Sequence, residues 1–461
     1  MAANSAQARD IAYQVHPQTN LRLHQTEGPL VVERGEGVYV YDDSGTRYLE
    51  GMAGLWCASL GFSEGRLAEV AYEQMKTLPY YHTFNGRSHP QSIDLAEKLI
   101  AIAPVKMSKV LFQSSGSEAN DTAIKLVWYY HNAIGKPKKK KIIGRAKGYH
   151  GTTAASVSLS GQALMHADFD LPLDRFRHTD HPHYYKLAEA GESEEAFATR
   201  MAERLEEMIL AEGPDTCAAF FAEPVQGAGG VIVPPRTYFE KIQAVLRKYD
   251  MLFVADEVIC GFGRTGNRWG SETFDLKPDM LTCAKALSAS YMPISALMIS
   301  EAIYESMLAE SEKIGIFGHG YTYSGHPVTS AVALETLKIY EERDVLGHVR
   351  RVAPYFQSKI GALADHPLVG EVSGVGLLAG LEIVKDKGTR EAFDPNVRIG
   401  DRIQRAALRH GLISRALGDR LALCPPLIVK EAEVDEIAGA VGNALDEVWS
   451  EVRPEGRAAA D

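Results

Sequence analysis

The 461-residue chain contains only five cysteines, and none belongs to a Cys-x-x-Cys pair. They stand far apart in apolar stretches, at Cys57, Cys217, Cys260, Cys283 and Cys424. An odd number at these spacings indicates neither a disulfide framework nor a zinc site. We therefore expect reduced thiols and a cytoplasmic location, since disulfides form in oxidising compartments.

The chain also lacks an excess of basic residues. Its 49 basic side chains are outnumbered by 60 acidic ones, for a net charge of −11. This balance disfavours nucleic acid or an anionic membrane as a partner. We interpret the one basic block, the lysines at 138–141, as a solvated loop rim. No apolar run approaches the roughly 20 residues that cross a bilayer, and residues 1–15 lack the apolar core of a signal peptide.

The overall composition is that of a globular protein, with 45% hydrophobic and 24% charged residues. A prior of roughly 150 residues per domain would give about three domains. No flexible linker or internal repeat divides the chain, so we favour two interlocked domains.

Short apolar runs alternate with amphipathic stretches from about residue 70 to 330. Six runs have the length and composition of buried strands: residues 110–115, 141–146, 218–225, 251–258, 279–284 and 295–300. Between two of them, residues 236–250 place apolar side chains at helical spacing, which predicts a helix. A strand, a helix and a strand in about 40 residues form a βαβ unit, so we predict an α/β fold with a mainly parallel sheet.

A carboxylate and a lysine follow two of these strands. Asp256 ends one apolar run, and Lys285 interrupts another one 29 residues later. Ligands collect at the carboxyl ends of parallel strands, so we expect both side chains at one site. The lysine can hold an aldehyde as a Schiff base, and the carboxylate can keep a pyridine nitrogen protonated. The pair predicts a pyridoxal 5′-phosphate enzyme with Lys285 and Asp256 as catalytic residues. A lysine that snorkels to the surface is the common alternative, but Ala284 and Ala286 indicate a confined site.

The stretch 251–299 resembles the signature of class III, or ω-type, aminotransferases of pyridoxal-phosphate fold type I, and the resemblance extends from about Leu21 to Val452. It implies a large domain, residues 61–327, with a seven-stranded, mainly parallel sheet flanked by helices. It also implies a smaller α/β domain built from residues 1–60 and 328–461. Within the latter we predict a strand hairpin at 368–384 and a disordered tail at 453–461.

Two segments are predicted to hold the cofactor phosphate. Ser115, Gly116 and Ser117 follow a strand and open a helix, where free N–H groups suit a phosphate, although a plain helix cap is the alternative. The resemblance makes them the phosphate cup. The loop 319–327 resembles the family loop in which Tyr321 and Thr322 reach the phosphate of the neighbouring subunit. This implies a homodimer with shared sites, or a tetramer that contains such dimers.

The resemblance assigns four further residues to the surroundings of the cofactor. Tyr149 would stack on the ring, and Val258, two residues beyond Asp256, would pack on the opposite side. Glu223 would lie near the cofactor hydroxyl and pair with an arginine. His150 would support the site without carrying the proton, because Lys285 can move it.

The remaining candidates concern the substrates. Arg415 resembles the arginine that binds the keto-acid carboxylate through a bidentate fork, with nearby Arg420 as the alternative. The amine pocket would be lined by Leu55, Trp56, Phe84, Tyr149 and Ala228. Enzymes that use 2-oxoglutarate commonly carry an acidic residue at the position of Ala228. We expect no metal: the spacing of His178, His181 and His183 fits no standard site, and an exposed loop is the simpler interpretation.

We therefore predict an ω-aminotransferase that moves an amino group from a primary amine or ω-amino acid to pyruvate, giving alanine and an aldehyde or ketone. β-Alanine, taurine, diamines and arylalkylamines all remain open as donors. A racemase, an aminomutase or a decarboxylating transaminase of the same fold stays as the alternative. A non-catalytic regulator is disfavoured by the intact lysine and by the short segment ahead of the pocket motifs.

Overall fold

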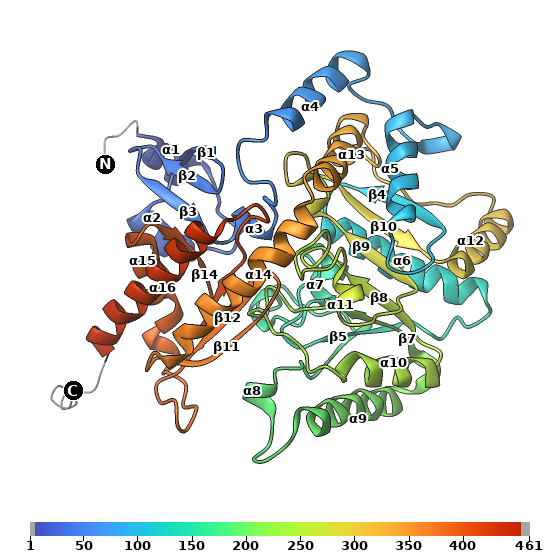
Figure 1. The fold of residues 1–461 in the computed structure, drawn as a ribbon. Coiled ribbons are helices and arrows are strands. Elements are labelled where there is room, and N and C mark those ends of the chain that lie inside the picture. Colours follow the sequence, from blue (N-terminus) through green and yellow to red (C-terminus); the bar gives the residue numbers. More distant parts are fainter. Residues whose placement is uncertain (1–4, 453–461) are drawn as a thin grey trace.

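The computed structural model describes residues 5–452, so the predicted disordered tail lies outside the described residues. Within this range a seven-stranded sheet forms the centre of the molecule (Figure 1). Its strand order is β4 (Lys109–Gln113), β10 (Ser295–Ile299), β9 (Met280–Cys283), β8 (Leu252–Asp256), β7 (Cys217–Ala222), β5 (Lys141–Arg145) and β6 (Phe176–Thr179). Only β10 runs antiparallel to its neighbours, so the other six strands end at the same edge.

Helices cover this sheet on both sides. The helices of this region are α4 (Gly65–Thr77), which packs against α13, and α5 (Pro90–Ala101), α6 (Gly116–Ala133), α7 (Ala154–Leu159), α8 (Tyr184–Leu187), α9 (Glu194–Glu212), α10 (Tyr238–Lys248), α11 (Gly270–Thr273), α12 (Glu301–Ile314) and α13 (Pro327–Glu342). On one face, α9 and α10 pack their apolar sides against β5, β7 and β8 around Phe220 and Phe253. On the other face, α6 packs through Ile124 and Val127.

The six predicted strands and the predicted helix are confirmed, with ends one to three residues inside the predicted bounds in most cases. The strand β6 was not predicted, because its sequence, Phe-Arg-His-Thr, contains a single apolar residue and shows no alternation of apolar and polar positions. The prediction that the strand of Asp256 continues to Val258 was wrong. It stops at Asp256, whose own carboxylate accepts a hydrogen bond from the N–H of Val258 at 3.1 Å.

Two four-stranded sheets lie beside the central one. The first contains β1 (Val32–Glu36), β2 (Tyr39–Asp42), β3 (Arg47–Glu50) and β13 (Leu412–Ile413). The second contains β11 (Val369–Val375), β12 (Leu378–Ile383), β15 (Arg420–Leu423) and β14 (Arg415–Leu417), and it includes the predicted hairpin. Because β3 pairs in parallel with β13, the two ends of the sequence share one sheet.

The helices on this side are α1 (Ala6–Tyr13), α2 (Leu21–Glu27), α3 (Ala53–Trp56), α14 (Val345–Gly361), α15 (Ile399–Arg409) and α16 (Glu431–Val452). Figure 1 shows the blue N-terminal elements next to the red helices α15 and α16, away from α9 and α10. Side chains of α14, α15 and α16 form one apolar core, in which Phe356 and Leu445 are fully buried. No helix within residues 5–452 combines the length and apolarity that a membrane crossing needs.

Two interpretations of surface segments were wrong. The three histidines do not lie in an exposed loop: His178 belongs to β6, and His183 is buried, where its Nε2 atom contacts Glu371 at 2.9 Å. The lysine block is not fully solvated either. Lys139 is buried, and its ammonium donates to the carbonyl oxygens of Tyr249 and Asp250 at 2.7 and 2.6 Å.

Candidate active site

The carboxyl edge of the central sheet gathers most of the predicted site residues. Asp256 ends β8, and Lys285 lies two residues beyond the end of the adjacent strand β9. Glu223 follows β7 directly, and Tyr149 and His150 follow β5. A strand sequence that ends in a polar residue thus places that residue at the shared edge, as expected for parallel strands.

The carboxylate of Asp256 is buried and surrounded by donors. Its Oδ2 atom lies 2.8 Å from Nδ1 of His150 and accepts from Nδ2 of Asn120 at 2.8 Å, while Oδ1 accepts from the N–H of Val258. Burial by itself raises the pKa of Asp256, but the hydrogen bonds and the nearby imidazole outweigh it and hold the pKa below its ordinary value. Asp256 is therefore a carboxylate that stays ionised.

Asn120 is a member of this network that the sequence interpretation missed. Its amide also donates to the carbonyl oxygen of His150 at 2.7 Å, and its Oδ1 accepts from the hydroxyl of Thr282 at 3.0 Å. The signal was present: Asn120 lies on the buried face of α6, among mostly apolar residues. A polar residue in such a position must find partners, which points to a site.

His150 is buried and connects Asp256 to the chain that follows β5. Because the carboxylate only accepts, Nδ1 of His150 carries the shared proton. Its backbone N–H donates to the hydroxyl of Ser160 at 2.7 Å, which fixes the segment. The predicted supporting role for His150 remains a proposal, and this geometry is consistent with it.

Lys285 lies in a strained backbone conformation. Its φ is 49°, a left-handed value that costs a non-glycine residue energy and is found often at functional sites. Its amine has no hydrogen bond or ion pair to any residue between 5 and 452. Burial lowers the pKa of Lys285 more than the nearby groups Cys57 and Asp256 raise it. The amine is thus biased towards its neutral, nucleophilic form.

Glu223 is buried, and backbone groups occupy both of its oxygens. Oε1 accepts from the N–H of Tyr149 and Oε2 from the N–H of Gly227, each at 3.0 Å. The expected pairing with an arginine side chain is absent within the described residues. Burial raises the pKa of Glu223, since two backbone donors and distant charges do not offset it. Here Glu223 fixes the position of Tyr149.

The two arginines of the C-terminal segment differ sharply. Arg415, at the start of β14, is half-buried, and its guanidinium has no hydrogen bond or ion pair within the described residues. Burial lowers the pKa of Arg415, and the phenol of Tyr149 opposes this shift. Arg420 is buried and fully engaged. It donates to Glu371, Glu382, Ser373 and the carbonyl of Gly230 and contacts His183. Arg420 is therefore structural, and Arg415 is the free guanidinium.

The predicted phosphate cup lies at the N-terminus of α6. Ser115 is the N-cap of α6, and its hydroxyl accepts a hydrogen bond from the N–H of Glu118 at 3.2 Å. The alternative interpretation of this segment as a helix cap is therefore also correct. The N–H groups of Gly116 and Ser117 have no partner between residues 5 and 452, which leaves them free for an anion. A Cβ atom at Gly116 would lie 3.2 Å from Val258, so a larger residue would crowd the passage between them.

The other predicted substrate residues lie in different surroundings. Leu55 is exposed, at 55%, and Ala228 is half-buried. Trp56 is buried in an apolar cluster with Cys424 and Val225, so it contributes to the core. The thiols of Cys57 and Cys424 both lie close enough to Lys285 to affect its pKa, a proximity that nothing in the sequence indicated.

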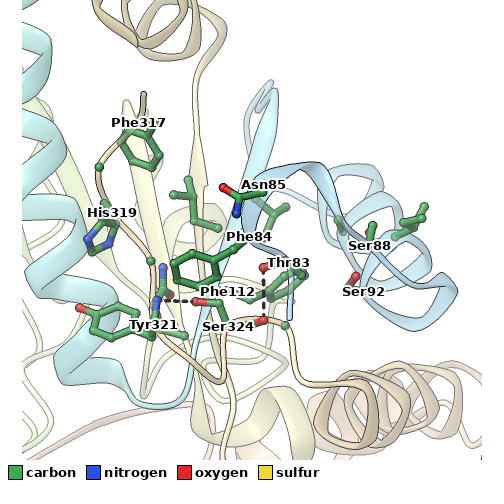
Figure 2. A pocket seen from close by; sticks show the side chains of 18 of the residues that line it. Thr83, Phe84, Asn85, Ser88, Ser92, Phe112, Phe317, His319, Tyr321 and Ser324 are labelled. Carbon is green, nitrogen blue, oxygen red and sulfur yellow. Dashed lines mark hydrogen bonds between the residues drawn. The ribbon is translucent and has the colours of Figure 1, made fainter. Parts of the chain in front are cut away.

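Phe84, Tyr321 and Thr322 form a second group on the surface. Figure 2 shows the ring of Phe84 against the loop that carries Tyr321 and Ser324, beside a pocket of about 730 Å³. The hydroxyl of Tyr321 donates to the carbonyl of Glu118 in α6 at 3.4 Å, and Tyr80 donates to the carbonyl of Thr322 at 2.8 Å. Neither Lys285 nor Asp256 lines this pocket. Phe84 and Tyr321 thus line a pocket to which Lys285 does not contribute.

Comparison with known proteins agrees with this geometry. The model of the family described as aminotransferase class-III matches residues 22–445. The chain belongs to the class III aminotransferases. It is 50% identical over 431 residues to the gamma aminobutyrate transaminase 3, chloroplastic, of Solanum lycopersicum, which covers 93% of this chain and 83% of that protein.

Solved structures give the same result. The omega transaminase from Pseudomonas jessenii in complex with PMP is 55% identical, with a TM-score of 0.96 over 98% of this chain and 100% of that one. A structure described as a transaminase with L-ala is 57% identical, with a TM-score of 0.90 over 92% and 100%. The seven-stranded α/β fold is confirmed as that of the family.

This class III aminotransferase uses pyridoxal 5′-phosphate, and its residues fit that cofactor. An unpaired lysine amine with a lowered pKa suits the aldehyde, and an ionised, buried carboxylate suits the pyridinium nitrogen. The free N–H groups at Gly116 and Ser117 suit the phosphate. The enzyme exchanges an amino group between an amine donor and a keto acid.

Proposed function

We propose that this enzyme transfers the amino group of a primary amine or ω-amino acid to pyruvate and forms alanine with an aldehyde or ketone. The observation that carries the proposal is the half-buried, unpaired guanidinium of Arg415 beside Tyr149. One such cation is enough for the single carboxylate of pyruvate. The small Ala228 adds no second charge for a dicarboxylate. The relatives named for gamma-aminobutyrate and L-alanine support an ω-amino donor and an alanine product.

The residues of the chain divide the chemistry between them. When bound, the cofactor supplies a pyridinium ring that accepts electrons from the substrate carbon. Asp256 holds the proton on the ring nitrogen, because its hydrogen bonds keep it ionised. Lys285 would hold the cofactor aldehyde until the donor amine replaces it, and its freed Nζ atom would then take the proton from the donor carbon and deliver it to the cofactor. Tyr149 and Val258 would hold the ring from its two sides.

Arg415 must serve two substrates of different charge. In the half-reaction with pyruvate its guanidinium binds the carboxylate, and in the other it lies near an uncharged amine tail. Since no residue between 5 and 452 forms an ion pair with it, Arg415 can turn away without breaking one of these contacts. In this structure Glu223 does not pair with it, and each carboxylate oxygen of Glu223 accepts one backbone N–H group.

The substrate proposal is tested with purified enzyme, pyridoxal 5′-phosphate and a panel of donors. The panel contains β-alanine, taurine, putrescine and 1-phenylethylamine, each with either pyruvate or 2-oxoglutarate. We expect alanine formed with pyruvate to exceed glutamate formed with 2-oxoglutarate for at least one donor. Faster turnover with 2-oxoglutarate for every active donor would contradict the proposal. Alanine racemisation or CO₂ release without a keto acid would assign a different reaction.

We also propose a homodimer with shared sites, in which Tyr321 and Thr322 contact the phosphate held by the partner subunit. The support is their position: Phe84 and Tyr321 line a surface pocket that Lys285 does not line, and Thr322 follows Tyr321 in the same loop. Two inactive variants test this. The Lys285→Ala chain keeps Thr322, and the Thr322→Asp chain keeps Lys285.

Hybrids of these two chains, co-expressed with different tags, should recover up to about half of the wild-type activity, since one of two sites is complete. Homodimers of either variant should be inactive. Hybrids that are as inactive as both parents would show that each chain supplies its own Thr322.

For the compartment we propose the cytoplasm, supported by five cysteines that all remain free thiols. The names of the plant relatives place those proteins in chloroplasts or mitochondria.

A further inference from the structure

Three potential metal ligands meet near the start of the described chain. Asp10 lies in α1, His24 in α2, and His16 in the segment between them. Nε2 of His16 lies 2.8 Å from Oδ2 of Asp10, and Nε2 of His24 lies 3.0 Å from the same oxygen. All three donor atoms fall within 4.8 Å of one another. We call these residues the N-terminal triad.

The spacing of the triad is close to that of a metal site. Zinc binds histidine nitrogen and carboxylate oxygen at about 2.0–2.2 Å, so two ligands of a tetrahedral ion lie about 3.3 Å apart. The separations of 2.8 and 3.0 Å are shorter by a few tenths of an ångström. A small outward movement of two side chains would open the space, with no change in backbone.

The environment favours a cation over bulk water as the partner. The side chain of His24 is only 9% exposed, that of Asp10 15% and that of His16 27%. With both imidazoles neutral, the triad carries one negative charge in a chain whose net charge is −11. Two imidazoles and one carboxylate suit zinc and its neighbours in the transition series, whereas magnesium and calcium prefer oxygen ligands.

The helices that carry the triad, α1 and α2, are short and contribute no fully buried side chain to a core. Neither α1 nor α2 contains a buried residue, and helices of eight and seven residues are too short to be stable by themselves. Between residues 5 and 452, α2 has one further ion pair, that of Glu27 with Arg405, and the ion pairs of α1 with residues outside that helix all involve Asp10. A metal ion here would therefore connect α1 to α2.

We propose that Asp10, His16 and His24 bind one zinc ion, which fastens α1 against α2. As the ion binds the two Nε2 atoms, each neutral imidazole carries its proton on Nδ1 instead of Nε2, and a water molecule completes a four-coordinate site. No hydrogen bond or ion pair links the triad to Lys285 or Asp256 within the described chain, so the ion would act on the packing of α1 and α2 and not on amino transfer. It departs from the expectation of a chain without metal.

The test uses the full-length holoenzyme after chelator treatment and dialysis. Zinc chloride is titrated by calorimetry into the wild type and into His16→Gln, His24→Gln and Asp10→Asn. His410→Gln is the matched control, because His410 also contacts a carboxylate, that of Glu447 at 2.9 Å, but without a second imidazole. We expect one zinc per chain in the wild type and the control. Each triad variant should bind more than about 100-fold more weakly, since even changes outside the ligand set cost 10–100-fold.

Hydrogen exchange gives a second readout that does not depend on activity. Zinc should slow exchange of the amides of residues 6–27 in the wild type and the control, and should have no such effect in His24→Gln. Zinc binding that survives in all three triad variants would overturn the proposal. So would a wild type that takes up no zinc, or one whose residues 6–27 exchange at the same rate with and without it, which would leave the triad as a hydrogen-bonded cluster only.

Discussion

The imidazole of His150 and the carboxylate of Asp256 form a buried pair at the end of β8, with Nδ1 2.8 Å from Oδ2. Asn120 approaches the same oxygen from α6. Together they hold a negative charge in a place where burial opposes it. A pyridinium nitrogen requires such a negative charge beside it. The packing of β8, α6 and the segment after β5 would therefore set the ionisation state that the cofactor needs.

Replacement of His150 by alanine should move the pH dependence of catalysis. Without the imidazole, the pKa of Asp256 rises, so the carboxylate is lost at a higher pH when the solution is acidified. We expect the acid limb of kcat to shift upward and kcat at neutral pH to fall about 10–100-fold, the value of one hydrogen bond to a charged group. His131→Gln, a buried histidine outside the site, is the control. An unchanged acid limb would separate His150 from the ionisation of Asp256.

Arg415→Ala should affect the two half-reactions unequally. The variant loses the bidentate ligand of the keto-acid carboxylate, so its kcat/KM for pyruvate should fall about 100-fold or more. The half-reaction with a simple amine, followed in a single turnover through the cofactor absorbance, should change less than about fivefold. Equal losses in both would refute this role for Arg415.

Arg420 should behave in the opposite way. It is buried among Glu371 and Glu382, so Arg420→Met leaves Glu371 without its arginine and Glu382 with Lys186 alone. Such a loss costs about 3–5 kcal/mol of folding free energy. Urea unfolding should detect it, while Arg415→Ala should differ from the wild type by less than about 1 kcal/mol. If both variants unfold at the same urea concentration, the structural assignment of Arg420 is wrong.

Glu50 should make stability depend on pH. Burial raises its pKa to about 7, although its carboxylate accepts from the N–H of Met52 at 2.9 Å. Between pH 4.5 and 7 the folded chain keeps a proton on Glu50 that the unfolded chain has lost, so stability falls as the pH rises. Glu50→Gln cannot bind this proton, so it removes the difference in protonation between the folded and the unfolded chain at this position. Its advantage over the wild type should grow between pH 5 and pH 8, by at most about 3 kcal/mol.

Thermal unfolding at pH 5, 6, 7 and 8 measures that advantage. Glu73→Gln is the control, because Glu73 is exposed and pairs only with Lys76 on the surface. An advantage of Glu50→Gln that is the same at pH 5 and pH 8 would show that Glu50 is ionised in the folded enzyme throughout.

The central sheet was predictable because its strands are short, apolar and separated by helices of clear period. The strand β6 was not predicted, because Arg177 and His178 interrupt its apolar residues. The pairing of β3 with β13 could not be predicted for another reason. Residues 47–50 and 412–413 are so far apart in sequence that no local pattern indicates their contact. The division into domains at residues 60 and 327 was an inference from family resemblance, and it stays a proposal.

The site was predictable where chemistry dictates a residue type at a strand end, as for Asp256 and Lys285. It was not predictable where a contact depends on packing between distant elements. Sequence alone left Arg415 and Arg420 as alternatives, and only the partners of Arg420 separate them. The positions of Cys57 and Cys424 near Lys285 depend on the same kind of tertiary contact.

Reduction of the holoenzyme with sodium borohydride, followed by mass spectrometry of its peptides, tests the catalytic assignment most directly. We expect one pyridoxyl phosphate group per chain, attached to Lys285, and no such label in Lys285→Ala, which should also be inactive by more than about 1,000-fold. A label on another lysine, or full activity in Lys285→Ala, would contradict the assignment.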